Sequence, residues 1–389
     1  MTGFPAVADL RDTLRRLAEV EAIELPVLSV YLDMRPQATG QAPGRRGSEV
    51  VLRDRLREIE RTYWPRGDDF DSFTADAERI RDYLESELDP SAQGLAIFAC
   101  SGIGLWETVV AGVPFSDAVS VGPTADLFQL ARLVDNHETA VVALVDSNTA
   151  RLFVTRAGRL EEVEGLDEDS VSFRKRSMGG WSQARYQRHI DKHIADFARD
   201  TASAIEALVE REGARRLVIA GDEVAVTPLT DALPPSVHEH IDEVLRIDMR
   251  AAPDDLAEEV RHALAAAEAA SGRSVADELI AAVRSGGLGV TDVKPTRRML
   301  EIGAVEVLVM SELPVAPAED STAADARDLG EQLEAMAGDD GDTAGPDLDT
   351  RNELVRLASM TSAEVEVVAD HPGLEKAGGV GALLRYRPG

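Results

Sequence analysis

A cationic segment with two adjacent glycines interrupts an otherwise strongly acidic chain of 389 residues. It reads RKRSMGGWSQARYQRHIDK from Arg174 to Lys192, and its glycine pair is Gly179 and Gly180. Glycine lets a backbone approach a crowded surface closely, and basic side chains neutralise phosphate groups. The residue types therefore predict an exposed loop that binds a polyanion. The basic residues are Arg174, Lys175, Arg176, Arg185, Arg188 and Lys192.

The charge of the whole chain limits where a polyanion such as RNA can bind. The net charge is −30, from 71 acidic and 41 basic residues. A uniformly acidic surface repels RNA, so an RNA contact has to be local. The alternative interpretation is a solvated helix face on which basic residues cluster by chance. The glycine pair favours the RNA-binding loop over that alternative.

The same segment resembles a catalytic loop and its following helix. The stretch GGWSQARYQR is similar to GGQSALRFAR of the eukaryotic and archaeal class I peptide chain release factors, with Tyr186 in place of phenylalanine. The identical residues are Gly179, Gly180, Ser182, Arg185 and Arg188. Three more stretches resemble this family in the same order along the chain. They are LPVLSVYLDMRP from Leu25, LEIGAVEVLVM from Leu300 and KAGGVGALLRYR from Lys376.

The resemblance implies hydrolysis of the ester that joins a nascent peptide to its tRNA. In the family, a Gly-Gly-Gln loop positions water in the peptidyl transferase centre through the backbone N–H and the side-chain amide of the glutamine. Trp181 stands at the third position here, so the N–H is retained and that amide is absent. Release-factor-like quality-control hydrolases rely on a nearby glutamine instead. The resemblance thus makes Gly179, Gly180 and Gln183 the catalytic candidates. The RNA-binding candidates are four arginines and one lysine: Arg174, Lys175, Arg176, Arg185 and Arg188.

Two functions of different class follow from the resemblance. The first is a codon-independent peptidyl-tRNA hydrolase for ribosome rescue and quality control, because the stop-codon element Asn-Ile-Lys-Ser of the family is missing. The second is a non-catalytic, pelota-like or hibernation factor that occupies the ribosomal A site, as expected if Trp181 blocks the water. We expect the hydrolase, since a factor that only occupies the A site requires neither Gln183 nor the glycine pair.

The expected partners follow from the same resemblance. They are the ribosome, at its A site and the peptidyl transferase centre of the large subunit, and peptidyl-tRNA. A translational GTPase is a further partner that the resemblance allows. Neither a cofactor nor a metal ion is expected. With no signal peptide and no long apolar stretch, the sequence predicts a cytoplasmic protein without a membrane partner.

The length and the periodicity of apolar residues predict an α/β fold. The length predicts two to three domains. Together with the apolar pattern, the resemblance implies three consecutive mixed, release-factor-like domains, at residues 1–122, 123–268 and 269–389. Predicted strands include 27–33, 94–100, 106–110, 140–145, 150–155, 216–220, 305–310, 364–368 and 383–386. Predicted helices include 52–63, 80–88, 184–210, 275–283, 296–302 and 352–361, and helical spacing also links Val7 to Leu17. Strands 140–145 and 150–155 should pair as a hairpin, because turn residues separate them.

An acidic insertion interrupts the third predicted domain. Residues 317–349 contain eleven acidic residues and one basic residue. Such a segment buries too little apolar surface to offset its ordering entropy, so we expect it to be disordered. The single cysteine, Cys100, ends an apolar run and is expected to be a buried small residue.

Histidine spacing suggests two weak metal-binding patterns. His189 and His193 share one face of a predicted helix, and His238 and His240 flank Glu239. No third ligand with a suitable spacing accompanies either pair. A surface position is the better interpretation for both.

Overall fold

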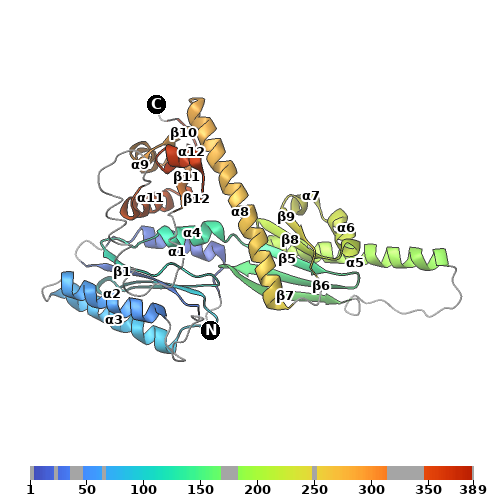
Figure 1. The fold of residues 1–389 in the computed structure, drawn as a ribbon, viewed down its shortest axis with the longest axis horizontal. Helices are drawn as coiled ribbons and strands as arrows, with labels where there is room; N and C mark the ends of the chain where they lie inside the picture. The colour runs from blue at the N-terminus through green and yellow to red at the C-terminus, as the bar shows by residue number, and fades with distance from the viewer. Residues whose placement is uncertain are drawn as a thin grey trace. The chain divides into compact units, whose positions relative to one another are not determined.

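The computed structural model describes residues 4–21, 25–35, 47–63, 67–167, 183–247, 252–312 and 346–387. Helices alternate with strands along these residues, and the strands form three separate sheets (Figure 1). The predicted α/β class is therefore confirmed. The chain packs into two compact units, of which the first comprises residues 1–11, 24–121 and 136–267 and the second the remainder. The division into three domains stays a prediction.

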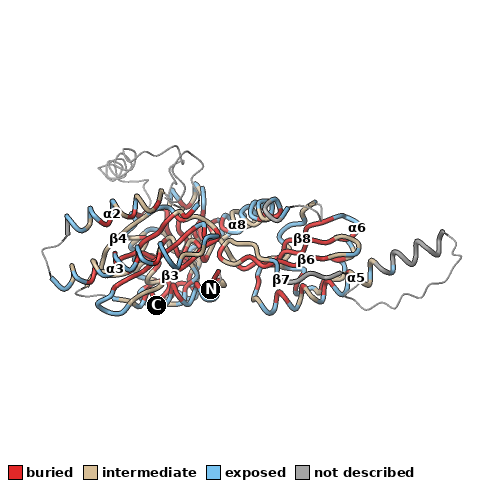
Figure 2. Tube along the Cα trace, turned by 90° about the horizontal axis from the view of Figure 1, so that it is seen from below, coloured by how far each residue is buried: buried red, intermediate tan, exposed pale blue. Residues whose placement is uncertain are grey.

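The first sheet of the first unit has the strand order β3-β2-β1-β4. Its two central strands are apolar runs that are buried almost throughout (Figure 2). Helices α2 (Gly47–Tyr63) and α3 (Asp68–Ser86) add Leu56 and Ile80 to the core beside this sheet. Cys100 is a buried free thiol, as predicted. The strands are β1 (Val27–Asp33), β2 (Gly94–Cys100), β3 (Leu105–Ala111) and β4 (Ala118–Gly122), and a short 3-10 turn, η1 (Ser101–Ile103), follows β2.

The second sheet of the first unit, called the middle sheet below, has the order β7-β6-β5-β8-β9. β5 and β6 pair antiparallel, which confirms the predicted hairpin. β5, β8 and β9 run parallel, and helices make the crossovers between them. The strands are β5 (Ala140–Val145), β6 (Thr149–Arg156), β7 (Arg159–Asp167), β8 (Arg216–Gly221) and β9 (Ile241–Leu245). The crossover helices are α5 (Gln183–Glu212), α6 (Glu223–Ala232) and α7 (Pro235–His238).

Helices cover both faces of the middle sheet because successive side chains of a strand point to opposite faces. Val141 and Ala143 of β5 share a core with Ile205 of α5 and Leu229 of α6. Val142 and Leu144 share another with Leu256 and Val260, from the first half of α8 (Pro253–Arg284). Burial on both faces explains why β5 and β8 read as continuous apolar runs.

The second unit contains a sheet of order β10-β13-β11-β12. The second half of α8 packs on it through Ala276 and Leu279, which share a core with Val309. Helix α11 contacts β11 and β12, and its Leu354 and Val355 are fully buried. The strands are β10 (Gly289–Thr291), β11 (Val305–Ser311), β12 (Glu364–Val368) and β13 (Val380–Leu384). The helices are α4 (Phe128–Asn136), α9 (Val293–Glu301), α11 (Leu348–Met360) and α12 (Pro372–Lys376), and α1 (Val7–Ala18) begins in the first unit and ends in this one.

Several predicted elements differ in their bounds from those in the structure. The helix predicted at 80–88 overlaps only the last part of α3, which spans Asp68–Ser86. The strand predicted at 383–386 is β13, which begins three residues earlier and ends at Leu384. The start of β13 was missed because glycine residues interrupt the apolar pattern there. Close packing explains the glycine at Gly381, because a Cβ atom there would lie 2.7 Å from Leu279 Cδ2. The helix predicted at 275–283 is only the last part of α8, which begins at Pro253.

The end of the predicted acidic insertion also needs correction. Residues 317–345 lie outside the described residues, but residues 346–349 are ordered parts of the fold. Asp347 is the N-cap of α11, and its carboxylate accepts a hydrogen bond of 2.8 Å from the Thr350 N–H. Asp349 follows in the first helical turn, where negative charge is favourable. These acids belong to a helix start rather than to a disordered segment.

Candidate functional site

The structure describes only part of the predicted loop and its helix. Gly179, Gly180, Arg174, Lys175 and Arg176 lie outside the described residues, and so does Trp181. Gln183, Arg185 and Arg188 lie on the described backbone of α5, while the positions of their side chains are not described. The helix predicted at 184–210 is confirmed. It begins at Gln183, so the predicted catalytic glutamine occupies its first residue.

The C-terminal end of α5 is fixed at the end of the middle sheet where β8 begins. Gly213 adopts φ +60°, and the Ala214 N–H closes the helix by donating to the Val209 carbonyl at 3.0 Å. This glycine-based C-cap turns the chain directly into β8. Helix α5 and strand β8 therefore run in opposite directions. The N-terminal end of α5 is directed towards the C-terminal ends of β5 and β8.

The N-terminal part of α5 extends past that end of the sheet (Figure 1). Among the α5 residues whose burial is described, Ala198 is the first buried one, and Ile194 lines a small cavity together with Val145 and Asp146 at the end of β5. Residues 183–193 precede these contacts and correspond to about 16 Å of helix at 1.5 Å per residue. A projecting helix end can reach a site that the sheet itself cannot enter.

The backbone and the sequence make the start of α5 electropositive. The first N–H groups of a helix lack partners within the helix, and aligned peptide dipoles give this end a partial positive charge. The first turn contains no acidic residue. Arg185, Arg188 and Lys192 are spaced three and four residues apart, a spacing that places them on one face of the helix. The backbone and the sequence thus favour binding of anionic groups at this end.

The sheet edge below α5 is built from tight loops. Gly221 ends β8 with φ +147°, and a Cβ atom there would lie 2.0 Å from the Val145 carbonyl oxygen. The Asp222 side chain caps α6 by accepting a 3.1 Å hydrogen bond from the Val224 N–H. Asp146 accepts hydrogen bonds from the N–H groups of Asn148 and Thr149 at 2.8 and 2.7 Å. These carboxylates restrain the loops that lie next to α5 at this end of the sheet.

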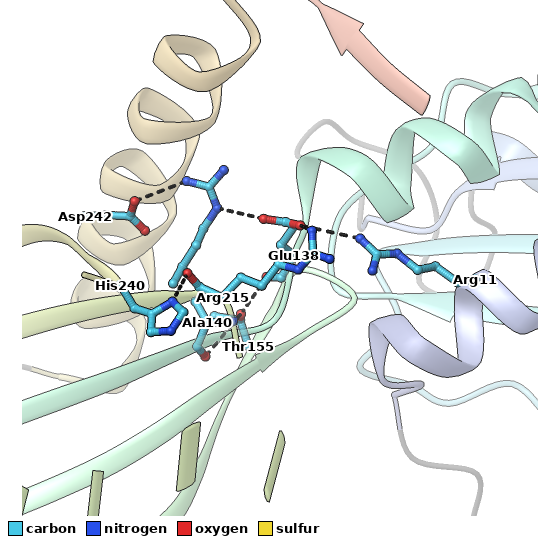
Figure 3. Close-up of polar contacts among 8 residues, drawn as sticks. Arg11, Glu138, Ala140, Thr155, Arg215, His240 and Asp242 are labelled. Carbon is cyan, nitrogen blue, oxygen red and sulfur yellow. Dashed lines mark hydrogen bonds and ion pairs between the residues drawn. The ribbon is translucent and has the colours of Figure 1, made fainter. Parts of the chain in front are cut away.

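A polar network that the sequence analysis did not single out occupies the opposite edge of the middle sheet (Figure 3). Glu138 Oε1 lies 3.5 Å from Arg11 Nη2 and 3.3 Å from Arg215 Nη1, and its Oε2 lies 3.4 Å from Arg216 Nε. Arg216 Nη1 also lies 3.3 Å from Asp242 Oδ1. The adjacent pair Arg215 and Arg216 at the start of a strand could have indicated this network from the sequence. The approach of Arg11 could not.

Burial shifts the ionisation of one acid in this network. It raises the pKa of the Asp242 carboxyl group, and Arg216 opposes that rise while Glu138 adds to it. His240 contacts the Arg215 carbonyl oxygen through Nδ1 at 2.8 Å, so that nitrogen carries the proton and donates. The imidazole thereby holds the backbone of Arg215 next to Glu138. We call Arg11, Glu138, Arg215, Arg216 and Asp242 the arginine network.

The histidine patterns form no metal site within the described residues. His189 and His193 lie on α5, and their side chains are not described. His238 and Glu239 line an open hollow of about 430 Å³ beside α6 and α7, with a mixed polar and apolar lining. Carboxylates that could together hold a cation occur in the described part of the second unit, at Asp135, Glu268 and Glu366, without any histidine.

A protein-family model matches the middle of the chain. Residues 126–269 match the family described as bacterial archaeo-eukaryotic release factor family 10. The resemblance to release factors is confirmed. The release-factor-like match begins in α4 and ends in α8, so it includes the middle sheet, α5 and the predicted loop. No curated protein sequence matches the chain.

Solved structures that align with the release-factor-like chain are distant. An archaeal translation termination factor, aRF1, is 18% identical over 98% of this chain and 99% of its own, with a TM-score of 0.27. Pelota of Archaeoglobus fulgidus is 16% identical over 76% and 79%, with a TM-score of 0.36. Dom34 of S. cerevisiae is 10% identical over 73% of each chain, with a TM-score of 0.41. At these TM-scores the family match is the informative comparison.

None of the described helices combines the length and the apolar character that a bilayer crossing requires.

Proposed function

We propose that this protein is a codon-independent, release-factor-like peptidyl-tRNA hydrolase that acts in ribosome rescue. A role in translation termination or rescue agrees with the family match over residues 126–269. The observation that carries the finer proposal is the projection of α5, whose first residue is Gln183, beyond the sheet. A loop at the tip of such a helix can enter a narrow centre while the sheet stays outside.

The proposed chemistry needs no cofactor. Gly179 and Gly180 allow the loop backbone to approach ribosomal RNA closely. The amide of Gln183 orients a water molecule, whose oxygen attacks the ester carbonyl carbon of peptidyl-tRNA. The bond from that carbon to the ribose oxygen breaks, the ribose oxygen takes up a proton, and the peptide leaves as an acid. The proposed RNA-binding residues hold phosphates of rRNA or tRNA; they are Arg174, Lys175, Arg176, Arg185 and Arg188.

The proposed partners are the ribosomal A site, the peptidyl transferase centre and peptidyl-tRNA, with a translational GTPase as a further candidate. The second candidate function is a pelota-like or hibernation factor that occupies the A site without hydrolysis. Trp181 favours that alternative, because an indole replaces the glutamine amide of the related loops. The two functions differ in peptide release and agree in ribosome binding.

The deciding experiment measures peptide release from stalled ribosome complexes that carry a labelled nascent chain. We expect release by the wild-type protein and a rate lower by about 10²–10³ for Gln183→Ala, as is typical when an orienting polar group is removed from a reacting site. Ribosome binding should persist. Gln187→Ala, one turn later on α5, is the matched control and should release peptide at the wild-type rate.

Trp181→Gln separates the two functions further. It restores the Gly-Gly-Gln order, so it should keep or raise the release rate if the protein is a hydrolase. Full release by Gln183→Ala would exclude this residue from the mechanism. Tight A-site binding without any release by the wild type would establish the non-catalytic alternative.

A further inference from the structure

Helix α9 of the second unit has a cationic outer face in a chain whose net charge is −30. The helix contains three basic residues and one acidic residue, Glu301. Arg297 pairs with Glu353 of α11. Lys294 and Arg298 are exposed, and neither lies within ion-pair distance of a carboxylate among the described residues. Their spacing of four residues places both cations on the same face of the helix.

An aromatic ring continues this face beyond the end of α9. Ile302 follows Arg298 by another four residues and is 48% exposed. Its carbonyl oxygen accepts a hydrogen bond of 3.3 Å from the hydroxyl group of Tyr386, which follows the end of β13. Tyr386 is 49% exposed, so its hydroxyl end is held while part of the ring stays open to solvent. We call Lys294, Arg298, Ile302 and Tyr386 the α9 surface.

The two arginines next to Tyr386 in sequence add positive charge. Arg387 Nη2 donates to the carbonyl oxygens of Gly286 and Gly287, and Arg385 Nη2 donates to the Ser362 carbonyl oxygen at 2.6 Å. A carbonyl group carries only a partial negative charge, so these contacts orient the guanidinium groups without neutralising them. Within the described residues, neither arginine forms an ion pair. The segment around Tyr386 is therefore cationic as well.

A nucleotide offers the chemistry that complements this surface. Its phosphate oxygens match the cations, and its base has a flat apolar face that matches the tyrosine ring. Proteins that bind single-stranded nucleic acid combine a cationic track with aromatic side chains on which bases stack. The cations and the ring are features of the structure, whereas the choice of RNA over another polyanion rests on the proposed function.

We propose that the α9 surface binds a single-stranded segment of RNA, with phosphates at Lys294 and Arg298 and a base stacked on Tyr386. Every residue of this surface belongs to the second unit. The predicted loop at residues 174–192 falls in the first unit, so the α9 surface is a separate RNA contact.

The test measures the affinity of the full-length protein for a short fluorescein-labelled single-stranded RNA by fluorescence anisotropy at several salt concentrations. The double variant Lys294→Gln with Arg298→Gln should bind more weakly. Its log–log slope of affinity against salt should be smaller by about 1.4 units, since each phosphate contact with a single strand contributes roughly 0.7. Lys376→Gln is the matched control, because this exposed lysine ends α12 before β13 begins, whereas Tyr386 follows the end of that strand. It should bind like the wild type.

Tyr386 gives a second readout that does not depend on charge. Tyr386→Ala removes the ring and should weaken RNA binding about tenfold with an unchanged salt slope, because stacking is not an ionic contact. Tyr386→Phe keeps the ring and should bind close to the wild-type affinity. A face that is merely solvated predicts wild-type affinity for Tyr386→Ala and a wild-type salt slope for the double variant, and either result in a folded protein overturns the proposal. Thermal melting checks the fold of each variant, and the tyrosine variants keep the proposal testable if the double variant is unfolded.

The predicted loop is expected to bind RNA too, so the same variants are also measured in a background with Arg174→Gln, Lys175→Gln and Arg176→Gln. Two independent sites predict equal fold-changes in both backgrounds. Loss of the effects in that background overturns the assignment of a separate site. Displacement of the RNA by polyglutamate as effective as that by unlabelled RNA would indicate an acidic protein partner and would overturn the choice of RNA. None of these measurements uses peptide release, so the proposed hydrolase function can fail while the α9 surface holds, and the reverse is equally detectable.

Discussion

Asn352 completes the start of a helix that begins 224 residues earlier in the chain. Its side-chain Oδ1 accepts hydrogen bonds from the N–H groups of Leu127 and Phe128, at 3.1 and 2.9 Å. These groups start α4, where intrahelical acceptors are missing. Asn352 lies on α11, so one helix caps the other.

Asn352→Ala should lower the free energy of unfolding of the second unit by about 1 kcal/mol, within the roughly 0.5–2 kcal/mol range of lost N-caps. Urea denaturation monitored by circular dichroism measures the change. Glu353→Ala is the control, because it removes only a half-exposed pairing with Arg297. Equal stability of the two variants would show that Asn352 has no capping role.

Asp76 is an acid that burial makes harder to ionise. Its side chain is 1% exposed, and burial raises its pKa, although hydrogen bonds from Ser101 and the charge of Arg79 oppose the rise. The Ser101 N–H donates to Oδ2 at 3.1 Å. Because the folded pKa lies above the unfolded one, the folded state holds this proton more tightly. The stability contributed by the group is present below the unfolded pKa and is lost as pH rises through the folded pKa.

Asp76→Asn should therefore gain stability relative to the wild type as pH rises from about 4 towards 7. Within the window between the two pKa values, the difference should change by up to about 1.4 kcal/mol per pH unit. Asn retains an acceptor for the Ser101 N–H, so folding should be preserved. The measurement is urea unfolding of both proteins across this pH range, and a constant difference contradicts the argument.

Helix α5 combines a packed part with a projecting part, and the two should respond differently to proline. Proline inside a packed helix costs roughly 3 kcal/mol or more, since it removes a hydrogen bond and clashes with the preceding turn. Gln187→Pro falls in the projecting part, and Ala202→Pro falls beside the buried core. We expect Gln187→Pro to melt near the wild-type temperature and to lose peptide release.

Ala202→Pro should melt at a much lower temperature than the wild type. Thermal melting of both variants in parallel separates the two parts of the helix. If Gln187→Pro destabilises the protein as strongly as Ala202→Pro, then the start of α5 is packed and does not project.

The elements that the sequence predicted best are those with a strong apolar pattern. β1, β2, β5 and β12 match their predicted ranges, because each is an uninterrupted or alternating run of β-forming residues. β7 and β9 were missed, because they are edge strands with many charged residues, which protect an exposed edge.

At the candidate site, the sequence predicted the helix and its first residue within one position, because the basic and apolar residues have helical spacing. The approach of Arg11 to Glu138 could not be predicted, since it joins residues 127 positions apart. The same limit applies to the cap that Asn352 provides for α4. Such contacts depend on the packing of whole elements, which local patterns do not encode.

On the scale of the whole molecule, the acidic surface and the local cationic sites set the salt dependence of binding. A chain with a net charge of −30 has to attach to RNA through few contacts. If four to six phosphates are neutralised, the logarithm of ribosome affinity should fall with the logarithm of salt concentration with a slope of about −4 to −5. Sedimentation with ribosomes at a series of salt concentrations measures the slope, and a flat dependence would exclude phosphate contacts as the anchor.

The second unit is discontinuous in sequence, since it gathers residues 12–23, 122–135 and 268–389. A chain emerging during its own synthesis therefore exposes α4 long before α11 exists to cap and cover it. This unit can complete its folding only after translation has nearly finished. Until then, its apolar helix faces stay uncovered by the rest of the unit. Truncation near residue 268 would likewise leave α4 without its cap, so shortened versions of this protein should aggregate more readily than the complete chain.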